Sequence, residues 1–207
     1  IKDFDPEDKD HFVANMYELY NGFLVLCCSA LIILTIPFAH ILYAKSFFVA
    51  WKYVPPLMIS FIFGGLSGFL GSIFTAVKDT KIFSYSTMIG AAVNTILNFI
   101  LVYYMGIMGA AIATLVSNAV IWLVRLQRSK RYISIRVNFV RHIVMYLLLV
   151  LQFVVCLLGL NIAPVMIQVV IFLLLIVANR KLIKTILEKI RIILRKYAKK
   201  DRRNVNE

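Results

Sequence analysis

Amide and hydroxyl side chains within two long apolar stretches are the residues of this chain best suited to chemistry. Asn94 and Asn98 lie one helical turn apart, and the next stretch supplies Thr114 and Ser117. Residues four apart share one face of a helix, so we expect both amides to point the same way. An amide in apolar surroundings needs a hydrogen-bond partner. The spacing therefore favours either hydrogen bonds between helices or a polar spot on a path for a substrate or cation.

A catalytic centre is not expected. Between Glu18 and Glu188 the only carboxylate is Asp79, so acid–base catalysis would lack partner groups. The sequence has no glycine motif for phosphates and no cysteine or histidine spacing typical of a zinc site. Gln152 and Gln168 stand alone in apolar stretches, where a glutamine more often joins helices than forms a site. We therefore expect no enzyme activity and no bound metal.

Two further groups of residues could act together. The first is a set of small residues that recur at three- and four-residue steps and suit close helix packing, either static or as a sliding face: Ser60, Gly64, Ser67, Gly68 and Gly71. The second is a basic cluster that could attract an anionic lipid head group or serve only to fix the topology: Arg125, Arg128, Lys130, Arg131, Arg136 and Arg141. We expect Arg125, at the end of its apolar stretch, to extend its charged group toward the lipid surface.

The elements that must position these residues are long apolar helices. The chain has 207 residues, 61% of them hydrophobic, and a mean hydropathy of +0.86. Its net charge of +13 comes largely from two blocks that flank apolar runs, a distribution typical of membrane proteins rather than nucleic-acid binders. We therefore predict an all-α integral membrane protein whose partners are membrane lipids and not nucleic acid.

Six stretches are long enough to be predicted as spans, since a bilayer core of ~30 Å needs about 20 residues of helix. They cover residues 21–43, 56–77, 82–104, 110–126, 142–160 and 164–179. The predicted organisation is an acidic cytoplasmic segment (1–20), a four-helix unit (21–126), a basic cytoplasmic loop (127–141), a terminal helix pair (142–179) and a basic amphipathic tail (180–207). In this layout 21 of the 23 Lys and Arg residues lie on one side of the membrane. Because the rich side is cytoplasmic, we expect both termini inside the cell.

The middle of the chain resembles a known family of transporters. The sequence reads FTAVKDTK at 74–81, IGAAVN at 89–94 and GIMGAAIATLVS at 106–117. This pattern is similar to the C-terminal half of polysaccharide flippases of the multidrug/oligosaccharidyl-lipid/polysaccharide exporter superfamily, and the resemblance covers residues 10–125. It implies the last six of fourteen spans, with the N-terminal half of the same transporter as a partner.

The resemblance also implies a function and a location. Such flippases move undecaprenyl-pyrophosphate-linked oligosaccharide across the bacterial inner membrane by alternating access, for polysaccharide biosynthesis. Related lipid II flippases bind sodium at positions similar to Asn94, Asn98 and Thr114, but here no carboxylate accompanies these residues. Sodium or proton coupling both stay open, and no other cofactor is expected. The alternatives are a cation-coupled multidrug exporter of the same superfamily and a non-catalytic membrane subunit of a polysaccharide assembly complex.

Overall fold

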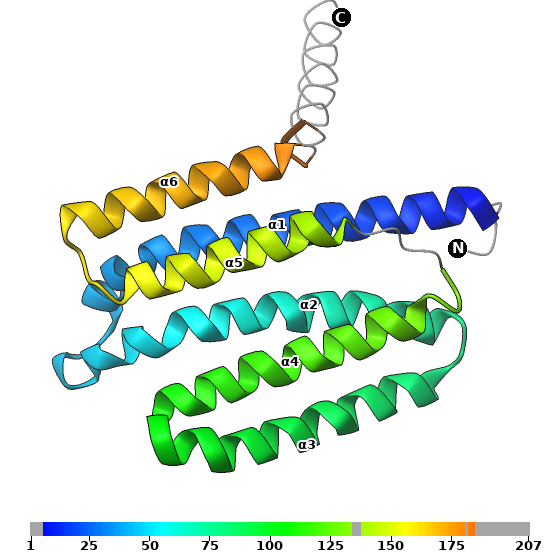
Figure 1. Ribbon diagram of the computed structural model, residues 1–207, viewed down its shortest axis with the longest axis horizontal. Coiled ribbons are helices and arrows are strands. Elements are labelled where there is room, and N and C mark those ends of the chain that lie inside the picture. Colours follow the sequence, from blue (N-terminus) through cyan, green and yellow to red (C-terminus); the bar gives the residue numbers. More distant parts are fainter. Residues whose placement is uncertain (1–5, 134–137, 181, 185–207) are drawn as a thin grey trace, which may run out of the picture.

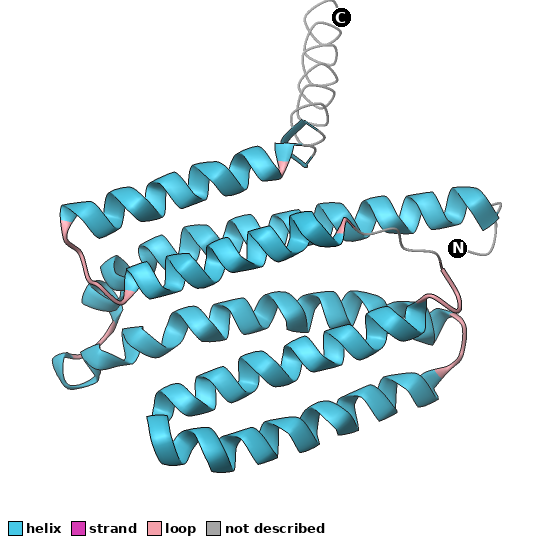
Figure 2. Cartoon of the chain, in the orientation of Figure 1, coloured by secondary structure: helices cyan, strands magenta, loops and turns pink. Residues whose placement is uncertain are grey.

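The chain folds into helices that lie side by side (Figure 1) and are joined by short connections (Figure 2). The computed structural model describes residues 6–133, 138–180 and 182–184. The elements in these residues are α1 (Pro6–Leu42), the 3₁₀-helix η1 (Lys45–Tyr53), α2 (Val54–Ala76), α3 (Thr80–Met105), α4 (Ile107–Ser129), α5 (Phe139–Cys156) and α6 (Ile162–Ala178). The predicted all-α class is confirmed.

In the part of the chain that the structure describes, four helical stretches are long and apolar enough to cross a membrane. They are Asp10–Leu42, Lys45–Ala76, Thr80–Met105 and Ile107–Ser129. Helices α5 and α6 are apolar but shorter, with 18 and 17 residues. At 1.5 Å per residue they are about 26–27 Å long, slightly less than the ~30 Å core of a bilayer.

Helix α1 differs most from its predicted bounds. It begins at Pro6, so the expected boundary between residues 20 and 21 falls inside a continuous helix. Val13, Tyr17 and Asn21 are buried at four-residue steps, and this face continues into the apolar part of the helix. Hydropathy alone missed the extension because charged residues interrupt the apolar ones on its other faces. The remaining five predicted spans differ from the helices by one to four residues at each end.

Helices α3 and α4 form a closely packed hairpin. Gly106 ends one helix and precedes the other with a φ of 56°, a left-handed conformation that glycine adopts readily. A Cβ atom on Gly109 would lie 2.1 Å from the carbonyl oxygen of Leu101. The two backbones can approach this closely only because residue 109 has no side chain.

The chain reversals gather at two ends of the bundle (Figure 1). The start of α1, the α2–α3 turn, the end of α4 and the end of α6 share one end. At this end the Tyr132 hydroxyl donates a hydrogen bond of 2.5 Å to Asp79, which raises the pKa of the Tyr132 phenol. The connections α1–η1, α3–α4 and α5–α6 share the other end.

Candidate functional site

The amides predicted to share one face do so, and they connect α3 to α4. Asn94 donates from Nδ2 to the Ser117 hydroxyl at 3.2 Å. Asn98 Nδ2 donates to the backbone oxygen and to Oδ1 of Asn94, at 2.9 and 3.0 Å. The Thr114 hydroxyl donates to the Ala110 carbonyl of its own helix, so this side chain does not bond to Asn94 or Asn98. Thr114 contributes its backbone carbonyl to the neighbouring contacts instead. The bridging hydrogen bonds between helices, one of the two predicted roles, are therefore present.

The polar contact continues from α4 to α2. The Thr114 carbonyl accepts hydrogen bonds from Ser117 at 3.0 Å and from Ser60 at 3.3 Å. Ser60 in turn accepts from Asn118 Nδ2 at 2.8 Å. A ladder of hydrogen-bonded neutral polar groups thus connects three helices.

This donor set does not fit the sodium ion that the resemblance implies. Asn94 Oδ1 already accepts the amide hydrogen of Asn98, and the Thr114 hydroxyl points to its own helix. Glu18 pairs with Arg141 and His142, and Asp79 accepts a hydrogen bond from Tyr132, so neither carboxylate belongs to this group of residues. A hard cation prefers several oxygen ligands, usually with a carboxylate.

The face of α3 that carries Asn94 and Asn98 is open to the outside of the bundle. A hollow of about 430 Å³ lies there, lined by Asn94, Thr95, Asn98, Phe99, Val102 and Tyr103. All six residues belong to α3, and Phe99 and Tyr103 are 81% and 83% exposed. The polar groups of α3 are therefore accessible from outside the bundle.

Most of the small residues of α2 face α4 or α3. Ser60 bonds to α4, and a Cβ atom on Gly64 would lie 3.8 Å from Asn118 Nδ2. A Cβ atom on Gly71 would come within 2.8 Å of the Phe83 ring. Gly68 does not belong to this contact, since a Cβ atom there would meet nothing within 4 Å.

Arg125 is buried and does not extend to the lipid surface as expected. Its side chain is 4% exposed. Nε donates to the Ser86 hydroxyl at 2.9 Å, Nη1 to the Ser67 carbonyl at 2.8 Å and Nη2 to the Thr87 hydroxyl at 3.0 Å. The guanidinium also lies 4.1 Å from the centre of the Phe83 ring. Oxygen atoms of α2 and α3 replace water around the charge, so the side chain has no need to leave the bundle.

The other members of the predicted basic cluster lie in different surroundings. Arg128, Lys130 and Arg131 are exposed at the end of α4, where they could meet an anionic group. Arg141 forms an ion pair with Glu18. Arg136 lies outside the described residues. The predicted basic cluster is therefore not one continuous surface.

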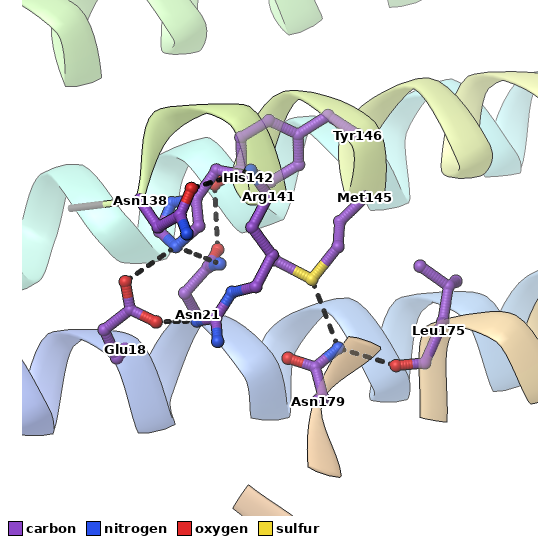
Figure 3. A network of polar contacts seen from close by, with 9 residues as sticks. All are labelled: Glu18, Asn21, Asn138, Arg141, His142, Met145, Tyr146, Leu175 and Asn179. Atoms are coloured by element: carbon purple, nitrogen blue, oxygen red, sulfur yellow. Dashed lines mark hydrogen bonds and ion pairs between the residues drawn. The ribbon is translucent and has the colours of Figure 1, made fainter. Parts of the chain in front are cut away.

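A polar network between α1 and α5 was not predicted (Figure 3). Glu18 contacts Arg141 through one carboxylate oxygen and His142 Nε2 through the other, at 3.1 Å. Tyr146 donates to Asn21 Oδ1 at 2.8 Å, and Asn21 Nδ2 lies 3.4 Å from the His142 ring nitrogen. The predicted cytoplasmic segment 1–20 includes Glu18, so the sequence analysis identifies no partner for its carboxylate.

The same two helices stay in contact farther along. Ser29 and Gln152 exchange two hydrogen bonds, of 2.6 and 3.0 Å, and the Cys156 thiol lies 3.8 Å from the Ile32 carbonyl. Partner residues differ by 121 to 125 in number throughout, so α1 and α5 run parallel. Single polar residues within otherwise apolar stretches, such as Ser29 and Gln152, were the available signal.

Comparison with known proteins does not place this arrangement in a family. No protein-family model, no curated protein and no solved structure matches the chain. A function must therefore be inferred from the residues themselves and from the resemblance of the 74–117 region.

Proposed function

We propose that this chain is an integral membrane protein of six spans that forms the C-terminal part of a flippase for lipid-linked oligosaccharides. The observation that carries the membrane proposal is the distribution of polar and apolar side chains. Asn21, Ser29 and Gln152 are buried and hydrogen-bonded inside the bundle, whereas Phe61 and Ile162 are 73% and 84% exposed. Hydrocarbon outside the bundle would favour this arrangement, because polar groups need partners inside and apolar groups need none.

The orientation follows from the basic residues. Lys78, Lys81 and the exposed residues at the end of α4 belong to the end of the bundle that also holds the start of α1 (Figure 1). Lys45 and Lys52 in η1 belong to the other end. The excess of basic residues supports a cytoplasmic position for the first end and for both termini, in the bacterial inner membrane.

The flippase assignment rests on the resemblance and on features that suit the task. The polar ladder across α2, α3 and α4 gives an uncharged path at mid-membrane beside the open hollow. The exposed residues Arg128, Lys130 and Arg131 could attract a pyrophosphate head group to the cytoplasmic side. The partner is the N-terminal half of the transporter, and alternating access would move one half against the other.

Depletion of the chain in the bacterium that encodes it tests this function. We expect undecaprenyl-pyrophosphate-linked oligosaccharide to accumulate in the inner leaflet, where an external glycosidase cannot reach it, and to return to the outer leaflet on re-expression. Greater sensitivity to cationic drugs with normal oligosaccharide export would instead identify a multidrug exporter. Normal export with altered polymer length would identify an assembly subunit, and either result would reject the flippase.

A further inference from the structure

The hollow on α3 combines two kinds of surface that rarely face lipid together. Thr95, Asn98 and Phe99 lie within one turn of each other, and Val102 and Tyr103 continue the same face. Phe99 and Tyr103 are more than four-fifths exposed, and the amide and hydroxyl groups of Asn94, Thr95 and Asn98 lie beside them on the preceding turn of the helix. An apolar face built for lipid tails alone would need no amide at this position.

Several polar atoms in the hollow are free to bind a ligand. Asn98 donates to Asn94, but its own Oδ1 has no hydrogen-bond partner among the described residues. The same holds for the Tyr103 hydroxyl in the part of the chain that the structure describes. Thr95 donates to the Ala91 carbonyl and keeps its lone pairs available. The hollow therefore offers acceptors at Asn98, Thr95 and Tyr103.

The lining of the hollow narrows the class of ligand. Among the described residues, no charged side chain lines it. A pyrophosphate would find no cation there, and a cationic drug would find no anion. A neutral sugar fits both surfaces, since its hydroxyl groups can donate to the free acceptors and its C–H faces can lie against aromatic rings.

We propose that the α3 hollow is a binding site for a neutral sugar ring of the lipid-linked oligosaccharide. Phe99 and Tyr103 cover the faces of the ring, and Asn98 and Thr95 accept from its hydroxyl groups. The inference rests on the proposed function, because a flippase must bring an oligosaccharide to mid-membrane. It assigns the sugar to a different place from the pyrophosphate, which the exposed basic residues would meet at the cytoplasmic end.

Saturation-transfer NMR on the full chain, purified in lauryldimethylamine oxide, tests the site. The probes are maltotriose and N,N′,N″-triacetylchitotriose, two neutral trisaccharides, and farnesyl pyrophosphate, which has no sugar. We expect saturation transfer to the ring protons of a trisaccharide, reduced about five-fold in Tyr103→Leu and further in a Phe99→Leu, Tyr103→Leu double variant. Asn98→Leu should weaken the same signal. Phe61→Leu, which removes an exposed ring from α2, is the matched control and should leave the signal unchanged.

The outcomes separate this inference from the proposed function. The sugar site would be overturned if neither trisaccharide received saturation. It would also be overturned if the double variant gave as much transfer as the native chain, or if Phe61→Leu lost as much signal as Tyr103→Leu. A parallel loss of the farnesyl pyrophosphate signal would do the same, because the hollow would then not select sugar. Trisaccharide binding that depends on Tyr103 supports the site even if depletion leaves oligosaccharide export normal, which would reject only the flippase. Export that requires the chain but tolerates the double variant would reject only the sugar site.

Discussion

At the scale of single residues, the bundle keeps a positive charge in its interior with neutral partners. Oxygen atoms of α2 and α3 accept hydrogen bonds from the Arg125 guanidinium, and the Phe83 ring packs against it. No carboxylate among the described residues pairs with this charge. A guanidinium suits this role because its planar fork can reach acceptors on two helices at once. Arg125 therefore joins α2 and α3 to α4 through one side chain.

Replacing Arg125 with lysine should destabilise the bundle although it keeps the charge. One ammonium cannot reach the Ser67 carbonyl and the Ser86 hydroxyl together, so we expect a loss of about 2–4 kcal/mol in the free energy of unfolding. Unfolding of the detergent-solubilised chain by SDS, followed by circular dichroism, measures it. Arg128→Lys, a change at an exposed residue of the same helix, is the control. Equal stability of the two variants would contradict the bridging role.

The Ser29–Gln152 pair should show a measurable but modest coupling. Both side chains are buried between α1 and α5, yet a serine hydroxyl can also turn to a carbonyl of its own helix. We expect a coupling of about 0.6 kcal/mol, and below about 1.7 kcal/mol, from a double-mutant cycle with Ser29→Ala and Gln152→Leu. Strictly additive effects of the two substitutions would show that the observed hydrogen bonds do not hold the helices together.

At the scale of elements, α1 and α5 form a parallel pair with a constant register. Asn21 lies opposite His142, Ser29 opposite Gln152, and the Ile32 carbonyl opposite Cys156. The buried positions between them are spaced three or four residues apart, as in other parallel helix pairs. The register places Val25 opposite Leu149, and both are fully buried.

Cysteine cross-linking can test this register. In a chain whose native cysteines are replaced by alanine, Val25→Cys with Leu149→Cys should form a disulfide on oxidation or react with a short bifunctional thiol reagent. Val25→Cys with Val150→Cys should not, because Val150 is exposed on another face of α5. Cross-linking of both pairs to the same extent would mean that α1 and α5 do not keep one register.

Alanine should have different effects at a glycine inside the α3–α4 contact and at an exposed glycine of α2. A methyl group at Gly109 would overlap the Leu101 carbonyl, so Gly109→Ala should cost about 1–3 kcal/mol of stability. Gly68→Ala meets nothing within 4 Å and should be neutral or stabilising by up to about 1 kcal/mol, because alanine favours helix more than glycine does. The same SDS titration compares them. A Gly109→Ala variant as stable as the native chain would show that the two backbones are farther apart.

The elements could be predicted more completely than their contacts. The bounds of α2, α3 and α4 differ by at most three residues from the predicted spans, because uninterrupted apolar runs mark them. The early start of α1 was missed, since its buried face is narrow and charged residues surround it. The burial of Arg125 was missed for another reason: a key acceptor is the Ser67 carbonyl, and a sequence does not show which backbone oxygen a side chain will meet.

At the scale of the whole molecule, the interior is polar in places and the surface is largely apolar. The buried side chains of Arg125, Ser29 and Gln152 lie on different helices, and each forms hydrogen bonds within the bundle. Such a molecule in water would expose many large apolar side chains, which favours association or aggregation. In a bilayer the same surface would be stable, so the membrane proposal explains the whole pattern with one assumption.

Reporter fusions along the chain should alternate between the two sides of the membrane. We expect fusions at Asp79 and Arg131 to report the cytoplasm, because basic residues resist transfer across the membrane. Fusions at Gly106 and Leu160 should report the opposite side, since these two connections carry no Lys or Arg and lie at the other end of the bundle. Helices α5 and α6 make the fusion at Leu160 the most demanding test, because each is only about 26–27 Å long and both must still cross. A reporter at Leu160 on the same side as one at Arg131 would mean that this pair lies at the surface, and the six-span layout would have to be replaced by four.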